Sequence, residues 1–376
     1  MIASAVGIYL LRAEGGPVQA RLVPASAAKL SPATERFERA NAPRAIKFPA
    51  DHGAHPDFQT EWWYYTGNLE TEDGRHFGYQ LTFFRRALLP PVDHIDRPSE
   101  WGTNQVYLAH FAITDVAEGQ YLAFERMSRG AAGLAGALAP SFKVWLHNWS
   151  VTQVDTQAYH LKAEQDGFSL DLQLVDLKGP VLQGDRGYSQ KGPQPGNASY
   201  YVSVTRLQTS GFVQIGQERF AVNGSSWMDH EYSTSALSEG QIGWDWFALQ
   251  LEDGNELMVF NLRRGDGTID PFSSGTLIQP NGSLQHLKRE DFRIEVLSTW
   301  RSPHSQAEYP ASWMVEVPSA GIRLRVEPFL ADQELNLTYT YWEGAVQVSG
   351  VHGDQPVSGS GYVELTGYAG SIAGEF

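Results

Sequence analysis

The stretch that decides the fold is Asp51-His-Gly-Ala-His-Pro-Asp-Phe-Gln-Thr-Glu-Trp-Trp-Tyr-Tyr-Thr-Gly67. It carries two histidines, three carboxylates and then four consecutive large aromatic residues. A second apolar run, Phe77-Gly-Tyr-Gln-Leu-Thr-Phe-Phe-Arg-Arg86, follows after the turn dipeptide Asp73-Gly74. An Asp-Gly pair between two apolar runs is a strong signal for a β-hairpin. We therefore predict two paired strands here, with a polar cluster at their start.

The rest of the chain repeats this pattern of short apolar runs and tight turns. Runs at residues 106–113, 168–175 and 200–205 are rich in Val, Tyr, Phe and Leu, and several alternate between apolar and polar residues. Turn dipeptides lie along the chain at Asp166-Gly167, Asp253-Gly254, Asp266-Gly267 and Asn281-Gly282. Alternation with a period of two is typical of half-buried antiparallel strands. The sequence therefore predicts an all-β protein.

Two segments of the chain share one order of motifs. Each has an Asp-His pair, a strand with two tryptophans, an Asp-Gly turn, a second apolar strand and an Arg-Arg end. The matched pairs are Asp51-His52 with Asp229-His230, Trp62-Trp63 with Trp244 and Trp246, Asp73-Gly74 with Asp253-Gly254, and Arg85-Arg86 with Arg263-Arg264. This internal repeat predicts two homologous antiparallel β-barrel domains, at residues 36–215 and 216–376. A barrel hides its strand edges and can hold one small apolar ligand.

Composition and charge narrow the classes of partner. The 376 residues carry a formal net charge of -15 and no cysteine. Nucleic-acid binding needs clustered Lys and Arg, so an acidic chain without basic runs is not expected to bind nucleic acid. Disulfides, zinc–thiolate sites and thiol catalysis are excluded because no thiol is available.

The N-terminal residues give information on the cellular location of the protein. Residues 2–11 form an apolar run that is too short to span a bilayer, and a Gly/Pro/Ala-rich stretch follows it. We interpret residues 1–30 as a leader that resembles a truncated secretory signal. This interpretation predicts a periplasmic or secreted protein with no transmembrane span in its mature chain. The alternative is a disordered or strand-like N-terminus.

The polar cluster of the opening stretch comprises Asp51, His52, His55, Asp57 and Glu61. Three interpretations are open: hydrogen bonds that plug one end of a barrel, an acid–base group at the mouth of a cavity, and a metal site. Imidazole and carboxylate ligands suit a borderline metal ion. No helical His-Glu-x-x-His accompanies them, and we predict no metal.

A second polar motif is Trp227-Met-Asp-His-Glu-Tyr232. Here the imidazole of His230 is flanked in sequence by the carboxylates of Asp229 and Glu231. A neighbouring carboxylate raises the pKa of a histidine and fixes its tautomer, which suits proton transfer. The alternative is a hydrogen-bond network between domains or within a loop.

The side chains of the predicted aromatic strands are the candidate ligand-binding surface. Adjacent residues of a strand face opposite sides, so Trp63 shares a face with Tyr65, and Trp244 shares one with Trp246. Such side chains either fill a core or line an apolar cavity to which a few polar groups are added. The candidate lining set is Trp63, Tyr65, Tyr79, Gln80, Trp244 and Trp246. No Gly-x-Ser-x-Gly elbow, phosphate loop or dinucleotide fingerprint occurs, and no cofactor is expected.

Together, Asp51 to Gly67, Trp227 to Tyr232, Trp244-Asp-Trp-Phe247 and Gly361-Tyr-Val-Glu-Leu-Thr-Gly-Tyr368 resemble the AttH-like branch of the carotenoid 1,2-hydratase (hydroxyneurosporene synthase) superfamily. The resemblance covers roughly residues 45–370. It implies two lipocalin-like β-barrel domains. It also implies an apolar ligand such as a carotenoid, isoprenoid or lipid, held within or between barrels.

Two functions follow from the resemblance. One is cofactor-free hydration of a terminal C=C bond of an acyclic carotenoid, in which Asp229 or Glu231 is the acid, His230 relays the proton, and Trp227 and Trp244 stabilise the cation. The other is a non-catalytic periplasmic carrier that serves components of an AttH-type ABC transporter. A purely structural protein, with barrels filled by side chains, is a third class.

Overall fold

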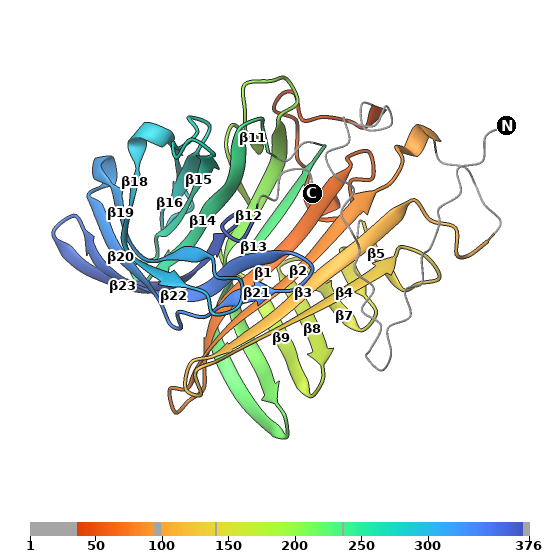
Figure 1. Cartoon of the computed structure of the whole chain (residues 1–376). Helices are drawn as coiled ribbons and strands as arrows, with labels where there is room; N and C mark the ends of the chain where they lie inside the picture. Colours follow the sequence, from red (N-terminus) through yellow and green to blue (C-terminus); the bar gives the residue numbers. More distant parts are fainter. Residues whose placement is uncertain (1–35, 94–98, 140, 235–236, 371–376) are drawn as a thin grey trace.

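The computed structural model describes residues 36–93, 99–139, 141–234 and 237–370. The predicted leader at residues 1–30 lies outside the described residues. Almost every regular element is a β-strand, and the strands form two separate antiparallel sheets that curl into nearly closed barrels (Figure 1). The predicted all-β fold with two barrels is confirmed. No helix in the described part of the chain is long and apolar enough to cross a membrane.

The first sheet has thirteen strands and runs from red through yellow to green in Figure 1. Its strands are β1 (Thr60–Glu70), β2 (His76–Ala87), β3 (Gln105–Asp115), β4 (Gln120–Arg129), β5 (Ala135–Leu138), β6 (Lys143–Leu146), β7 (Trp149–Asp155), β8 (Ala158–Gln165), β9 (Phe168–Asp176), β10 (Val181–Leu182), β11 (Tyr188–Gln190), β12 (Ala198–Ile215) and β13 (Glu218–Ser233). Their order is β4-β3-β2-β1-β13-β12-β9-β8-β7-β6-β5, and the short β10 and β11 also pair with β12.

The second sheet has ten strands and forms the cyan-to-blue barrel in Figure 1. Its strands are β14 (Gln241–Leu251), β15 (Glu256–Arg264), β16 (Ser274–Ile278), β17 (Leu284–Lys288), β18 (Arg293–Arg301), β19 (Glu308–Val317), β20 (Ile322–Pro328), β21 (Glu334–Asn336), β22 (Thr340–His352) and β23 (Gln355–Leu365). Their order is β17-β16-β15-β14-β23-β22-β20-β19-β18, with β21 beside β22. Short 3₁₀ turns lie at Ala50–His52, Pro91–Asp93, Arg289–Asp291 and Pro318–Ala320.

The predicted hairpin is confirmed as β1 and β2. The two strands pair from Thr60 opposite Arg86 to Glu70 opposite His76. Gly74 in the turn has φ +87°, a backbone conformation that glycine adopts at no steric cost. Alternation along β1 then sends Trp63 into the core of the first barrel and Tyr64 to its outer face.

The repeat exists, but its copies align differently from the prediction. In each sheet a hairpin (β1–β2, β14–β15) is followed in sheet order by a strand from the end of the repeat (β13, β23). The Asp229-His230 pair therefore lies at the end of the first barrel, where His230 is opposite Trp63 of β1. It does not open the second barrel, and the sheets divide the chain after Ser233 rather than between residues 215 and 216. The physical reason is that similar dipeptides do not determine which strands pair, and β13 pairs with β1.

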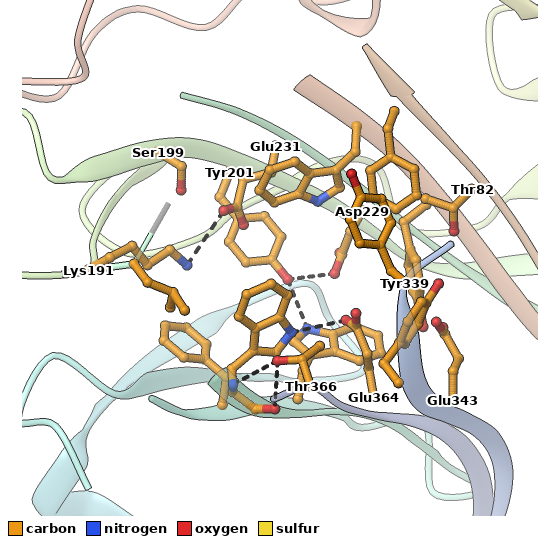
Figure 2. Close-up of a pocket in the computed structure, with 18 of the residues that line it drawn as sticks. Thr82, Lys191, Ser199, Tyr201, Asp229, Glu231, Tyr339, Glu343, Glu364 and Thr366 are labelled. Atoms are coloured by element: carbon orange, nitrogen blue, oxygen red, sulfur yellow. Dashed lines mark hydrogen bonds and ion pairs between the residues drawn. The ribbon is translucent and has the colours of Figure 1, made fainter. Parts of the chain in front are cut away.

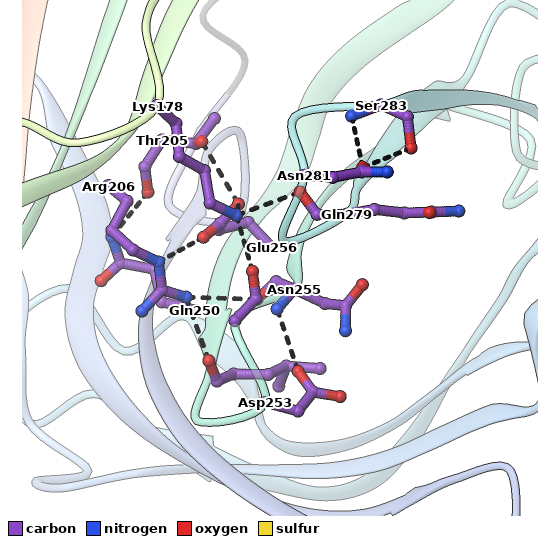
Figure 3. Close-up of polar contacts among 12 residues, drawn as sticks. Lys178, Thr205, Arg206, Gln250, Asp253, Asn255, Glu256, Gln279, Asn281 and Ser283 are labelled. Atoms are coloured by element: carbon purple, nitrogen blue, oxygen red, sulfur yellow. Dashed lines mark hydrogen bonds and ion pairs between the residues drawn. The ribbon is translucent and has the colours of Figure 1, made fainter.

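The outer faces of the two barrels pack on one another. Tyr64, Trp227 and Trp246 belong to one buried apolar cluster between the sheets. A β-bulge between Val204 and Leu207 lies in β12, next to Arg206. There the Glu256 carboxylate of β15 accepts hydrogen bonds from Arg206 and, at 2.6 Å, from Lys178 (Figure 3). This ion cluster joins the barrels beside the apolar contact.

Candidate functional site

A pocket lies between the two barrels, on the face that β1, β2, β12 and β13 present to β14, β15, β22 and β23 (Figure 2). It contains about 1100 Å³ of space not filled by atoms, part of it open to solvent. Its aromatic and apolar lining is Trp62, Tyr64, Phe84, Tyr201, Leu237, Trp244, Trp246, Phe260, Leu262, Tyr339 and Tyr341. Its other lining residues are Gln80, Thr82, Lys191, Ser199, Asp229, Glu231, Glu343, Glu364 and Thr366. Four carboxyl groups thus share one largely aromatic pocket.

Asp229 is the most strongly positioned of these carboxyl groups. Oδ2 accepts a hydrogen bond of 2.5 Å from the Tyr201 hydroxyl. Oδ1 accepts hydrogen bonds from Ser203 at 2.5 Å and from the Trp227 indole at 2.7 Å. Burial nevertheless raises the pKa of Asp229 to about 7, with a further contribution from the charge of Glu231, because desolvation outweighs the three donors. Asp229 therefore exchanges a proton near neutral pH.

Glu364 and Glu343 approach from the second barrel. The Trp244 indole donates a hydrogen bond of 3.1 Å to Glu364, and burial together with the charges of Asp229 and Glu231 raises the pKa of Glu364 to about 7. Burial and the charge of Glu364 hold the pKa of Glu343 well above its usual value. At neutral pH the pocket thus contains carboxylic acids that retain their protons.

Glu231 and Lys191 form a loose pair on another side of the pocket, with 3.7 Å between Nζ and Oε1. Burial raises the pKa of Glu231 and lowers the pKa of Lys191, and each charge partly offsets the shift of the other. The ammonium group of Lys191 also lies 4.2 Å from the centre of the Phe260 ring. Burial thus works against full ionisation of both groups.

This arrangement is suited to acid–base chemistry on an apolar molecule. Asp229 and Glu364 line the same pocket and both have a pKa of about 7, so that near neutral pH one can be the acid while the other is the base. The faces of Trp and Tyr side chains attract a developing positive charge. Protonation of a carbon–carbon double bond, or loss of a protonated hydroxyl, needs both features.

The structure separates the predicted ligand residues by strand parity. Gln80, Trp244 and Trp246 line the pocket, whereas Trp227 packs behind it against Trp246. The remaining three, Trp63, Tyr65 and Tyr79, lie in the core of the first barrel and are fully buried. The prediction that these three contact a ligand is therefore wrong. The pocket uses the other face of β1.

Several pocket residues were missed by the sequence prediction. Trp62 and Tyr64 belong to the same aromatic run, and assigning the other face of that strand to the ligand would have predicted them. Tyr201, Glu343 and Glu364 gave no local signal, because only the packing of one barrel on the other brings them to the pocket.

His230 does not lie between Asp229 and Glu231 in space. Adjacent residues on β13 face opposite sides, so the imidazole points away from the pocket and its ring stacks on Trp63, with 5.1 Å between centroids. Nε2 of His230 lies 2.8 Å from the buried carboxylate of Glu61. The predicted proton relay through His230 is therefore wrong.

The first polar cluster gathers around Glu61. Its two oxygens meet four donors at 2.8–2.9 Å: the Arg85 guanidinium, the His230 ring, and both the ring and the backbone N–H of His55. The other ring nitrogen of His55 lies 3.0 Å from Asp51. These bonds hold the segment before β1 against β2 and β13.

Two members of the predicted cluster lie apart from Glu61, and a metal is not favoured there. Burial lowers the pKa of His52 to about 4, and Asp57 is exposed. Ligand atoms of His55, Glu61 and His230 lie within 4.8 Å of one another. Both carboxylate oxygens of Glu61 are nevertheless engaged, one of them by a buried arginine, so a cation would have to displace existing donors.

The model of the AttH-like family matches residues 39–368. A crystal structure of a protein described as an AttH from Nitrosomonas europaea is 34% identical, with a TM-score of 0.76, and the match covers 87% of this chain and 99% of that one. Kievitone hydratase from Nectria haematococca shares the fold at 16% identity, with a TM-score of 0.66, and the match covers 89% of this chain and 96% of that one.

Among curated proteins, this chain is similar to the dehydratase asqC of Emericella nidulans. It is 22% identical over 217 residues, which is 55% of this chain and 56% of that protein. The chain spans about half the length of the curated relatives that it matches.

Proposed function

Because this chain belongs to the AttH-like family and has an acidic, aromatic pocket between its barrels, we propose that it is a hydratase or dehydratase. The reaction adds water to, or removes water from, a carbon–carbon double bond of a largely apolar small molecule. The observation that carries the proposal is the convergence of Asp229 and Glu364 on one aromatic pocket. A hydratase and a dehydratase among proteins that share the fold or part of the sequence support the reaction class.

In the hydration direction, the carboxylic acid of Asp229 gives its proton to one carbon of the double bond, and the π electrons form the new C–H bond. The adjacent carbon becomes a tertiary cation, which the faces of Trp244 and Trp246 stabilise. A water oxygen then bonds to this carbon, and its surplus proton passes to the carboxylate of Glu364. One water is consumed, and return of the proton to Asp229 resets the pocket. Dehydration is the reverse, and no cofactor takes part.

The substrate class that we propose is an isoprenoid, with the terminal double bond of an acyclic carotenoid as the specific candidate. The assay incubates the purified protein with neurosporene or lycopene in H₂¹⁸O and analyses the product by mass spectrometry. We expect a hydroxylated product that carries ¹⁸O. A product without ¹⁸O, or none under conditions in which an established hydratase works, contradicts the proposal for this substrate.

A matched pair of variants tests the assigned acid. Asp229→Asn keeps the shape of the side chain but cannot donate the proton, and we expect turnover to fall at least about 100-fold. Asp354→Asn makes the same change at an exposed turn and should leave turnover unchanged. Equal activity of both variants would remove Asp229 from the mechanism.

The second candidate function is a non-catalytic carrier of lipid for an ABC transporter, in a periplasmic or secreted setting. The aromatic lining favours it, because such a surface holds an apolar molecule whether or not the molecule reacts. Native mass spectrometry of the protein purified from its host distinguishes the two functions. A lipid that co-purifies unchanged, with no ¹⁸O incorporation, favours the carrier, whereas repeated purification without any bound lipid counts against it.

A further inference from the structure

The pocket offers more hydrogen-bonding groups than a hydrocarbon can use. We propose that it recognises a hydroxylated, otherwise apolar molecule, whose hydroxyl group binds to Gln80, Glu343 and Tyr64. This inference rests on the proposed function for the location of the reaction, and it narrows the proposed isoprenoid class to molecules that already carry a hydroxyl group. The named residues form what we call the hydroxyl cluster.

Unpartnered polar atoms are the first observation. Oε1 of Gln80 is buried and has no hydrogen-bond partner among the residues that the structure describes. Oε1 of Glu343 and the hydroxyl of Tyr64 are also buried without a partner at full hydrogen-bond geometry, although the Tyr64 hydroxyl interacts with the Glu343 carboxyl group. Gln80 and Glu343 are 0% exposed and Tyr64 is 6% exposed, and all three line the pocket. Buried polar atoms are costly to leave without a partner, so a ligand that satisfies them gains affinity.

The cluster is rigidly held, which is the second observation. Nε2 of Gln80 lies 2.9 Å from Oε2 of Glu343 and 2.9 Å from the Thr82 hydroxyl, so the carbonyl oxygen is the part of this amide that is left without a partner. The adjacent Tyr341 hydroxyl is 3.2 Å from Gln80 and 2.7 Å from Nδ1 of His110. A ligand therefore meets these groups without having to order them first.

The chemistry of the cluster selects an alcohol. Burial raises the pKa of Glu343 well above its usual value and so favours the protonated form, which can donate a hydrogen bond, while the carbonyl of Gln80 is an acceptor. A hydroxyl group can donate to Gln80 and accept from Glu343 at the same time. A carboxylate ligand would face four carboxyl groups, and a hydrocarbon would leave the unpartnered atoms as they are.

Placement of the cluster gives it a role in specificity. Glu343 and Lys191 lie on opposite sides of the pocket in Figure 2, with Asp229 and Tyr201 between them. When the hydroxyl group is bound beside Glu343, the apolar part of the molecule lies along Asp229 and the indoles of Trp244 and Trp246. The anchor therefore determines which double bond lies next to the proton donor.

A binding experiment with matched probes tests this inference without requiring turnover. Geraniol and 2,6-dimethylocta-2,6-diene share one carbon skeleton and differ only by the hydroxyl group. Binding of each to the full-length protein is measured by quenching of tryptophan fluorescence and by calorimetry. We expect geraniol to bind at least about tenfold more tightly, because the hydrocarbon leaves buried polar groups of the site unpaired.

Variants assign the preference to the cluster. Gln80→Leu should reduce the preference to about twofold or less, and Tyr64→Phe, which removes one oxygen atom, should reduce it several-fold. Gln347→Leu, an exposed change on the same strand as Glu343, should preserve it. If Gln80→Leu does not fold, Tyr64→Phe still decides the result.

Two outcomes overturn the inference: equal or tighter binding of the hydrocarbon, or a preference for alcohol that neither variant changes. Tighter binding of geranylamine than of geraniol also contradicts it, because an ammonium group would then be paired with an ionised Glu343. Absence of turnover overturns the proposed function but leaves the measured preference intact, so the two failures are distinguishable.

Discussion

Asp229 and His230 are adjacent on β13 and lie on opposite faces of the first sheet. The carboxyl group of Asp229 faces the pocket between the barrels, and the ring of His230 lies against Glu61 and Trp63 inside the first barrel. One short motif thus serves two separate environments. The chemistry that we assign to the pocket does not involve His230, and the two residues should respond differently to mutation.

His230→Ala should destabilise the fold without altering the pocket. The change removes a buried hydrogen bond to Glu61 and a ring that stacks on Trp63, which we expect to lower the free energy of unfolding by about 2–4 kcal/mol. Urea denaturation measures this loss. Turnover per folded molecule should match that of the unmodified protein, and a large drop in turnover at unchanged stability would return His230 to the mechanism.

The pH dependence of stability should report the protonated state of Asp229. Its pKa is about 7 in the folded protein and near the ordinary aspartate value of 3.8 in the unfolded protein, so the native state holds the extra proton between these pH values. The contribution of Asp229 to the free energy of unfolding should therefore fall by up to about 4 kcal/mol as pH rises from about 4 to 7. Asp229→Asn should remove this contribution, so the free energy of unfolding of the variant should rise more, or fall less, with pH than that of the unmodified protein. An unchanged slope in urea titrations at pH 4, 5.5, 7 and 8 would contradict the assignment.

Trp62 and Trp63 provide a test of the two faces of β1. Trp63 is fully buried and donates a hydrogen bond of 2.9 Å to the carbonyl of His52, so Trp63→Ala should cost about 3–5 kcal/mol. Trp62 lines the pocket, and Trp62→Ala should cost less than about 1.5 kcal/mol while weakening binding of an apolar probe. Thermal denaturation and probe fluorescence distinguish the variants. Equal stability losses would mean that the pocket face is part of the core.

Glu256 should be required for the junction of the barrels. Its buried carboxylate compensates the charges of Lys178 and Arg206, and Glu256→Gln leaves both cations with a neutral partner. We expect a loss of about 3–5 kcal/mol in stability. Glu72→Gln at an exposed turn is the control and should be neutral. A neutral Glu256→Gln would show that the barrels are held together by the apolar contact alone.

Local sequence signals were sufficient to predict the strands and the two-barrel architecture. The hairpin of β1 and β2 followed from an Asp-Gly turn between apolar runs, and two barrels followed from the repeat of that hairpin in β14 and β15. The order of the strands in the sheets could not be predicted from local signals. The extension of the first sheet through β13 depends on pairing between residues far apart in the chain, such as Trp63 and His230.

The site was only partly predictable for the same reason. Asp229 and Glu231 were identified from their motif, because two carboxylates flank a histidine there. The prediction assigned the wrong face of β1 to the ligand, since both faces of Trp62-Trp63-Tyr64-Tyr65 are equally apolar in sequence. Glu343 and Glu364 reach the pocket only through packing of the second barrel on the first, which no local pattern encodes.

The most direct test of the account is the ionisation of the pocket carboxyl groups. Carbon-13 NMR of the protein labelled at its aspartate and glutamate carboxyl carbons, titrated from pH 3 to 9, follows each group. We predict one resonance that titrates near pH 7 and disappears in Asp229→Asn, and a second that disappears in Glu364→Gln. If the resonances lost in these two variants instead titrate below pH 5, both groups are ionised at neutral pH, and an acid-catalysed reaction in this pocket is contradicted.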